Sequence, residues 1–224
     1  MKMAIKNTEL KKQDIINEMI WNDKIDASQV EVEVDDGKVE LSGTVGSFRE
    51  RREAELDAWS VLGVRNVEND LKVDLTEGFS YPSDEELKDR VNNTLSWDFA
   101  IDSSNIELSV ENGWVTIEGT VDSFWKIAYT ENEVSKVLGV VGITNKLAAA
   151  PKKRVSDDLI AKDIMDAIER KALILPEEID LMVKDNVVTL NGNVSSWSAW
   201  REAYDAAENT LGVINVIDNI KINP

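Results

Sequence analysis

The stretch VDDGKVELSGTVGSF at residues 34–48 decides the fold, because it returns twice further along the chain. The later copies read VENGWVTIEGTVDSF at 110–124 and VKDNVVTLNGNVSSW at 183–197. The three copies align without gaps, and the similarity continues on both sides of them. Self-similarity of this kind is the signature of a repeat protein. We therefore predict that the 224 residues form three tandem copies of one small unit.

Two alternating runs of apolar and polar residues surround a turn in each copy. In the first copy Val30, Val32 and Val34 precede the turn, and Val39 and Leu41 follow it. A period of two is typical of half-buried strands. The residue pairs at the turns tolerate positive φ and favour a two-residue hairpin: Asp36-Gly37, Asn112-Gly113 and Asp185-Asn186.

Helices are expected on both sides of each hairpin. The helix before it carries apolar residues at helical spacing, as at Leu87, Val91 and Leu95. The helix after it is expected to begin near Ser47, Ser123 and Ser196. It is expected to end at a glycine that serves as a left-handed C-cap, namely Gly63, Gly139 and Gly212. A last strand then follows, from Val64 to Val73 in the first copy.

The predicted fold class is α+β, with three tandem αββαβ modules. Each module is expected to be a small mixed three-stranded sheet with two helices packed on one face. Proline-containing breaks in the periodicity at 76–83 and 148–156 mark the linkers. The modules are placed at 1–77, 78–150 and 151–224. Units of this size are marginally stable alone, so docking between modules is expected to contribute to stability.

The composition argues against an enzyme. The chain has no histidine and no cysteine, which removes the usual general base, the thiolate nucleophile and the ordinary zinc ligands. No Walker loop, GxGxxG motif or GxSxG elbow is present. We therefore expect no catalytic residue, no cofactor and no bound metal.

The net charge limits the partners. The chain carries −18 in total, divided as −7, −7 and −4 over the three copies. Such a protein is repelled by nucleic acid and by bare anionic lipid. No apolar run reaches the length of a signal peptide or of a membrane span. The chain as written is expected to be cytoplasmic, or periplasmic if a leader has been removed.

Candidate contact residues come from the tryptophans, of which the chain has seven. Those that differ between copies are the candidates for docking between modules or for partner and lipid contact, with local packing as the alternative: Trp125, Trp197, Trp200, Trp114 and Trp59. Trp21 and Trp97 occupy the same place in two copies, so they are expected to pack in the core or at its rim.

The repeated glycines and acids have simpler explanations. Gly43, Gly119 and Gly192 are expected to allow a bend or a close approach of the backbone. Acidic groups such as Asp84-Glu85-Glu86 and Asp157-Asp158 suit helix starts. They are expected to be solvated, with a hard cation such as calcium as the alternative.

Each copy resembles the BON domain, a bacterial module named for an osmotically induced protein and for nodulation proteins. The resemblance is carried by V-x-L-x-G-x-V at 39–45, 115–121 (with Ile117 for leucine) and 188–194. It is also carried by L-G-V-x-x-V/I-x-N/D-x-L/I, which begins at Leu62, Leu138 and Leu211. The signature positions of that family include six glycines, namely Gly43, Gly119, Gly192, Gly63, Gly139 and Gly212.

The resemblance implies an α-β-β-α-β fold and a non-enzymatic role in binding phospholipid or membrane surfaces during osmotic or envelope stress. Two departures stand against it: many members have a signal peptide, and three acidic modules do not suit anionic lipid. A protein-protein scaffold or chaperone-like holder with three similar faces is the alternative. Potassium binding, known in some relatives, is a minor alternative.

Overall fold

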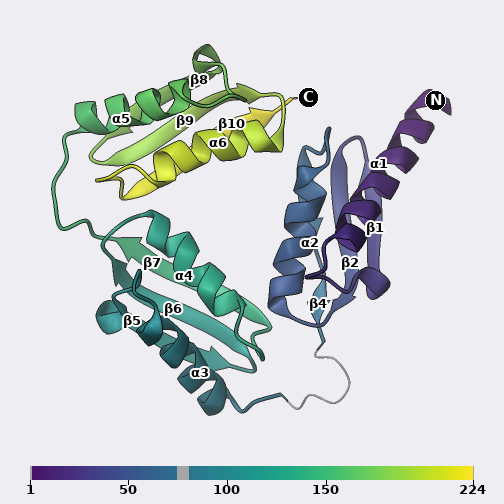
Figure 1. Ribbon diagram of the computed structural model, residues 1–224, viewed down its shortest axis with the longest axis horizontal. Helices are drawn as coiled ribbons and strands as arrows, with labels where there is room; N and C mark the ends of the chain where they lie inside the picture. The colour runs from purple at the N-terminus through teal and green to yellow at the C-terminus, as the bar shows by residue number, and fades with distance from the viewer. Residues whose placement is uncertain (1, 75–80, 224) are drawn as a thin grey trace.

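The computed structural model describes residues 2–74 and 81–223 as three small α/β modules in chain order (Figure 1). The first contains α1 (Lys2–Trp21), β1 (Val30–Asp35), β2 (Lys38–Val45), α2 (Phe48–Ser60), β3 (Asn66–Asn69) and β4 (Lys72–Val73). The second contains α3 (Asp84–Trp97), β5 (Ile106–Glu111), β6 (Trp114–Val121), α4 (Trp125–Ser135) and β7 (Gly142–Ala149). The third contains α5 (Asp157–Glu169), β8 (Ile179–Lys184), β9 (Val187–Val194), α6 (Trp197–Glu208) and β10 (Asn215–Ile222).

This element order confirms the predicted α+β class. Most of the first expected linker, at 76–80, lies outside the described residues.

Each sheet has the same mixed topology. The middle strand (β2, β6 or β9) pairs antiparallel with the strand before it and parallel with the last strand of its module. The hairpin turns have positive φ at both central residues, for example 40° at Asp36 and 81° at Gly37. That geometry matches the twist of the flanking strands. The predicted two-residue hairpins are therefore confirmed.

One buried apolar cluster lies in each module, between the two helices and one face of the sheet. The alternation of β1 shows the arrangement: Val32 is buried under the helices, whereas Glu31 and Glu33 face solvent on the opposite face. In α3 the predicted residues Leu87, Val91 and Leu95 supply the buried face.

The last strand of the first module is divided, although the sequence predicts one strand. The Arg51 guanidinium donates to the carbonyl oxygens of Asn69 and Leu71, and it thereby holds the segment between β3 and β4. At the matching positions Ile127 has no side-chain donor, and the indole N–H of Trp200 donates to the Asp218 carboxylate and not to the backbone. In their modules β7 and β10 run unbroken.

The second helices end earlier than predicted. Their last residues are Ser60, Ser135 and Glu208, which lie before the glycines. The glycines belong to the turn that leads into the last strand, with φ of 85° at Gly63, 108° at Gly139 and 96° at Gly212. The expected left-handed C-cap is therefore wrong, although the turn still requires positive φ.

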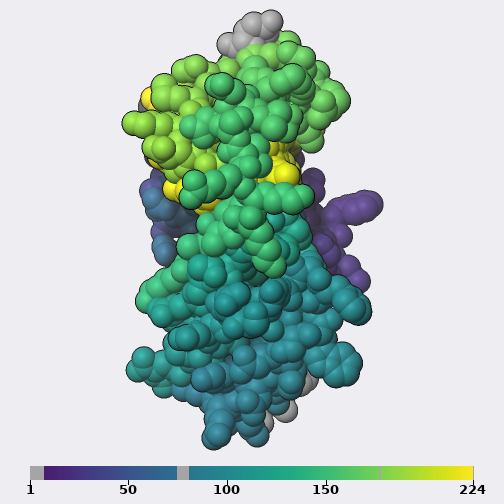
Figure 2. Space-filling view, turned by 90° about the vertical axis from the view of Figure 1, so that its left-hand side faces the viewer, coloured from purple at the N-terminus to yellow at the C-terminus, as the bar shows by residue number. Residues whose placement is uncertain are grey.

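The three modules are arranged around a common centre, with α2, α4 and α6 turned toward it (Figure 1). Figure 2 shows the third module resting on the second, with the first behind them. Phe48 begins α2 in the first module but belongs to the buried cluster of the second. Phe124, at the matching position, packs against the cluster of the third module. The modules therefore share apolar contacts along the chain.

Candidate binding surfaces

Large apolar side chains are exposed where the first helix of each module ends. Trp21 is 88% exposed, Trp97 is 83% exposed, and Phe99 beside Trp97 is fully exposed. The third module exposes Leu173 and Leu175 in the corresponding loop. We call these five residues the tips. Isolated exposed apolar residues are ordinary, so it is the recurrence of these side chains at one place in the repeat that makes them candidates for a contact.

The expectation that Trp21 and Trp97 pack in the core or at its rim is wrong, for a geometric reason. Met19 and Leu95 are buried two residues earlier. Two residues turn an α-helix by about 200°, so each tryptophan faces away from the core. The helical period therefore places both tryptophans outside the core, whereas their shared position in the repeat suggested that they pack in it.

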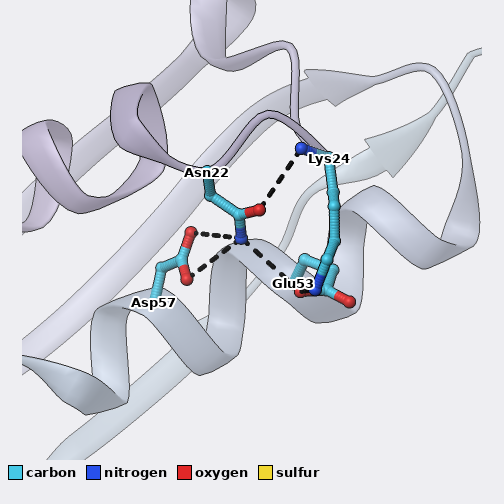
Figure 3. A network of polar contacts seen from close by, with 4 residues as sticks. All are labelled: Asn22, Lys24, Glu53 and Asp57. Atoms are coloured by element: carbon cyan, nitrogen blue, oxygen red, sulfur yellow. Dashed lines mark hydrogen bonds and ion pairs between the residues drawn. The ribbon is translucent and has the colours of Figure 1, made fainter.

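Polar contacts with the second helix hold the tips in place. In the first module Asn22, next to Trp21, donates from Nδ2 to Asp57 Oδ2 at 2.9 Å and to Glu53 Oε2 at 3.5 Å (Figure 3). Lys24 Nζ lies 3.1 Å from the same Glu53 oxygen. Asn22 therefore turns inward, which leaves Trp21 pointing outward.

The other modules use the matching position of the second helix for the same purpose. Tyr129 donates from its hydroxyl to Asp98 Oδ2 at 2.9 Å, beside Trp97. This hydrogen bond raises the pKa of Tyr129, so the phenol keeps its proton. In the third module Glu202 Oε2 accepts from the backbone N–H of Leu173 at 3.4 Å. The tips are therefore fixed features of the fold.

A cavity of about 510 Å³ lies where the three second helices meet. Its lining includes Arg52 from α2, Trp125 and Tyr129 from α4, and Trp197 and Glu208 from α6. Trp125 and Tyr129 meet edge to face, with ring centroids 5.4 Å apart. This central cavity therefore brings the candidates Trp125 and Trp197 together.

Burial in this region raises the pKa of Glu208, despite Arg201 Nη2 at 3.3 Å. Glu208 is only 5% exposed. Nearby Asp205, which shares Arg201, raises the pKa of Glu208 further.

A second opening of about 440 Å³, which we call the outer groove, lies between the first and third modules. Trp59 and Arg65 line it from the first module. The third module contributes Trp197, Trp200, Asp218, Ile220, Lys221 and Ile222. Three of the five candidate tryptophans therefore converge on this groove.

Trp114 stands apart from the other candidates. It is half exposed on β6, and its indole N–H donates to Thr144 Oγ1 at 2.8 Å. Its ring covers Gly142, where a Cβ would lie 2.4 Å from the indole. Trp114 lines a hollow with residues of β5 on the sheet. The fold does not bring it to the module junction.

The glycines of the middle strands lie against the backbone of the preceding segment. A Cβ on Gly43 would lie 2.0 Å from the carbonyl oxygen of Gln29, and Gly119 and Gly192 show the same approach to Asn105 and Glu178. Their φ values of 107°, 127° and 151° also disfavour other residues. These positions thus have a backbone role.

Two of the acidic groups have a structural function that sequence reasoning missed. The Asp84 carboxylate accepts from the backbone N–H of Asn112 and of Gly113 at 2.8 and 2.9 Å. Asp157 does the same for Asp185 and Asn186, both at 2.9 Å. The signal was the repeated acid at the start of the first helix in two copies. Across residues 2–74 and 81–223, no three acidic side chains are grouped as a metal site would require.

The family model described as BON domain matches residues 9–74, 83–151 and 156–224. A curated relative is the osmotically-inducible protein Y of Escherichia coli (strain K12), which is 30% identical over 132 residues. That match covers 58% of this chain and 66% of the relative, slightly less than two thirds of its length.

Two solved structures from Chlamydia trachomatis are also similar over 95% of this chain. Both are of CdsD, a structural protein of the type III secretion system, and one is its C-terminal domain. Each is 14% identical with a TM-score of 0.28, over 91% and 96% of those chains. Scores this low support no argument about function. Within the described part of this chain, no helix is both long and apolar enough to cross a bilayer.

Proposed function

This chain belongs to the BON domain family, with three copies in tandem, and on that premise we propose that it is a non-catalytic protein that attaches to phospholipid membrane surfaces. The similarity to an osmotically-inducible protein supports a role in the response to osmotic stress. The lack of histidine and cysteine supports the non-catalytic part of the proposal.

The exposed tips carry the proposal. Tryptophan combines an apolar ring with an indole N–H, so it favours the boundary between water and hydrocarbon. In the second module Trp97 and Phe99 are both exposed, and the hydrogen bond from Tyr129 holds Asp98, the residue between them. Little side-chain and loop ordering then remains to oppose insertion.

The net charge of −18 determines which surfaces are suitable. Anionic headgroups repel such a chain, because membrane attraction normally uses lysine and arginine clusters. The proposal therefore specifies zwitterionic lipid, or anionic lipid bridged by divalent cations.

Liposome flotation tests this proposal. We expect the chain to float with zwitterionic liposomes, and to float with anionic liposomes only when Ca²⁺ or Mg²⁺ is present. Trp97→Ser with Phe99→Ser should weaken binding by at least about tenfold, because even partial burial of two aromatic rings contributes more than roughly 1.4 kcal/mol. Trp114→Ser is the matched control, because it removes an exposed tryptophan of the same module away from the tip. Absence of flotation with every lipid would contradict the proposal.

A second candidate, a holder of other proteins, is favoured by the signature leucines. Leu62, Leu138 and Leu211 are exposed in all three modules, although a valine two residues later is buried in each. Three equal apolar points on one chain suit weak multivalent capture. Suppression of the aggregation of a heat-unfolded client protein, lost in the triple leucine-to-serine variant, would support this candidate. Unchanged aggregation with the wild-type chain would exclude it.

A further inference from the structure

Three tryptophans that break the repeat meet in the outer groove. Trp59 has no aromatic counterpart, because Ser135 and Glu208 occupy its place in the other modules. Trp200 likewise stands where the other modules have Arg51 and Ile127. Trp197 replaces a phenylalanine that the other two modules share. All three line the same cavity. Three separate departures from a repeat that converge on one place indicate a site that the repeat itself does not need.

The outer groove lies at the one module contact that no linker joins. The apolar contacts that follow the chain are filled by Phe48 and Phe124. Between the third and first modules, by contrast, about 440 Å³ stays open. That volume lies within the range of small-molecule sites, which favour boundaries between domains.

The aromatic wall of the groove is held by its own contacts. Trp200 stacks on Tyr204 at 5.3 Å between ring centroids, and Trp197 lies 6.3 Å from Trp200. The Trp200 indole N–H donates to Asp218 Oδ2 at 2.7 Å, and Asp218 Oδ1 accepts from the backbone N–H of Ile220 at 3.0 Å. The wall is therefore preorganised, and it combines indole rings with a carboxylate.

The charges of the groove differ from those of the chain as a whole. Arg65 and Lys221 line it against the single acid Asp218, whereas the whole chain carries −18. The Arg65 side chain is exposed, and its Nη2 lies 3.6 Å from Asp36 Oδ1. The groove thus offers a cationic rim beside an aromatic wall with an acid.

We propose that the outer groove binds a small zwitterion that joins a quaternary ammonium group to an anionic group, with the chemistry of phosphocholine. Indole faces beside a carboxylate attract quaternary ammonium groups. Arg65 and Lys221 attract the anionic group and disfavour a simple cation. This site is separate from the tips and goes beyond membrane attachment.

Calorimetric titration of the full chain with phosphocholine, choline and inorganic phosphate tests the proposal. Phosphocholine should bind saturably and about tenfold more tightly than either fragment, because only the zwitterion uses both halves of the groove. Absence of saturable phosphocholine binding would overturn the proposal and would mean that the groove is only a seam between modules. Equal affinity for choline would overturn the role of the cationic rim.

Variants locate the binding. Trp59→Ser introduces the residue of the second module and should weaken phosphocholine binding about tenfold. Trp114→Ser, on the second sheet and away from the module junction, should bind as the wild type does. Arg65→Gln, on the exposed rim, should weaken phosphocholine but not choline, and it serves as the test if Trp59→Ser does not fold. Wild-type phosphocholine affinity in both groove variants would overturn the assignment.

The source of the ligand is decided by competition. Flotation with phosphatidylcholine liposomes is repeated with saturating free phosphocholine. Loss of flotation assigns the groove to a lipid headgroup, and retained flotation assigns it to a soluble zwitterion. Both interpretations require that phosphocholine binds in the titration above. A groove that does not bind phosphocholine is therefore distinguished from tips that do not bind membranes.

Discussion

Glu208 is an acid buried at the module junction, where the matching residues of the other modules are Trp59 and Ser135. Its carboxylate lies near Arg201 in the central cavity. Burial raises the pKa of Glu208 more than Arg201 lowers it. The charged form is therefore tolerated at a cost to the folded state. Asp57, beside Asn22, shows the same direction for the same first cause.

This raised pKa predicts how stability depends on pH. The folded chain binds the Glu208 proton more tightly than the unfolded chain does, so this contribution to stability is present at low pH. It is lost as pH rises from the ordinary value of 4.5 through the raised pKa. Glu208→Gln should therefore raise the melting temperature at pH 7 and leave it nearly unchanged at pH 4. Glu202→Gln, on the same helix, is the control. A gain in the melting temperature of Glu208→Gln that is larger at pH 4 than at pH 7 would contradict the prediction.

In the second and third modules, the start of the first helix holds the hairpin turn. Asp157 accepts two backbone N–H groups from the turn at Asp185 and Asn186. These two residues lie 28 and 29 positions after Asp157 in the chain. Asp84 repeats this contact in the second module. A hydrogen bond thus sets the helix against the sheet at the end where the hairpin turns.

Asp157→Ala should destabilise the third module by about 1–3 kcal/mol, because two turn amides lose a charged acceptor. Urea denaturation measures the change, and hydrogen exchange at Asp185 and Asn186 locates it. Asp158→Ala removes the same charge from the same helix start, but its side chain is exposed. If both variants lose equal stability, the helix dipole rather than the turn explains the effect.

The sequence alone predicted the elements because their periods are local. Hairpin turns followed from pairs such as Asp36-Gly37, and the core faces of the helices followed from spacing such as that of Leu87 and Val91. Features that depend on contacts between distant segments were missed. The carbonyl oxygens of Asn69 and Leu71, at the break between β3 and β4, accept hydrogen bonds from Arg51, which lies on another element. Phe48 matched Phe124 in the repeat, but no local pattern showed that it packs on the next module.

The candidate sites divide in the same way. Differences between copies singled out Trp59, Trp197 and Trp200, and these three side chains line the outer groove. The similarity between Trp21 and Trp97 suggested packing that the structure does not have. Apart from Trp114, the tryptophans that differ between copies therefore lie at the module junctions, whereas the two that share a position are exposed at helix ends.

Along the chain, a phenylalanine of one module packs into or against the core of the next. Phe48 is 7% exposed and lies in the cluster of the second module, which also contains Leu87 and Val91. Arg52 of α2 and Glu131 of α4 add an ion pair at 3.8 Å across the same junction. Such a small, partly exposed pair contributes little, so the apolar contact dominates the coupling.

Phe48→Ala should therefore loosen the module that follows it as well as its own. A buried phenylalanine typically contributes about 3–5 kcal/mol, and part of that loss should fall on the second module because Phe48 belongs to its core. Hydrogen exchange read by mass spectrometry should show lower protection in β5, β6 and β7, with β8, β9 and β10 unchanged. Phe99→Ala removes an exposed ring from the second module itself and should leave all three sheets protected. If the exchange in Phe48→Ala rises only in β1 and β2, the modules fold independently, and the shared core does not couple them.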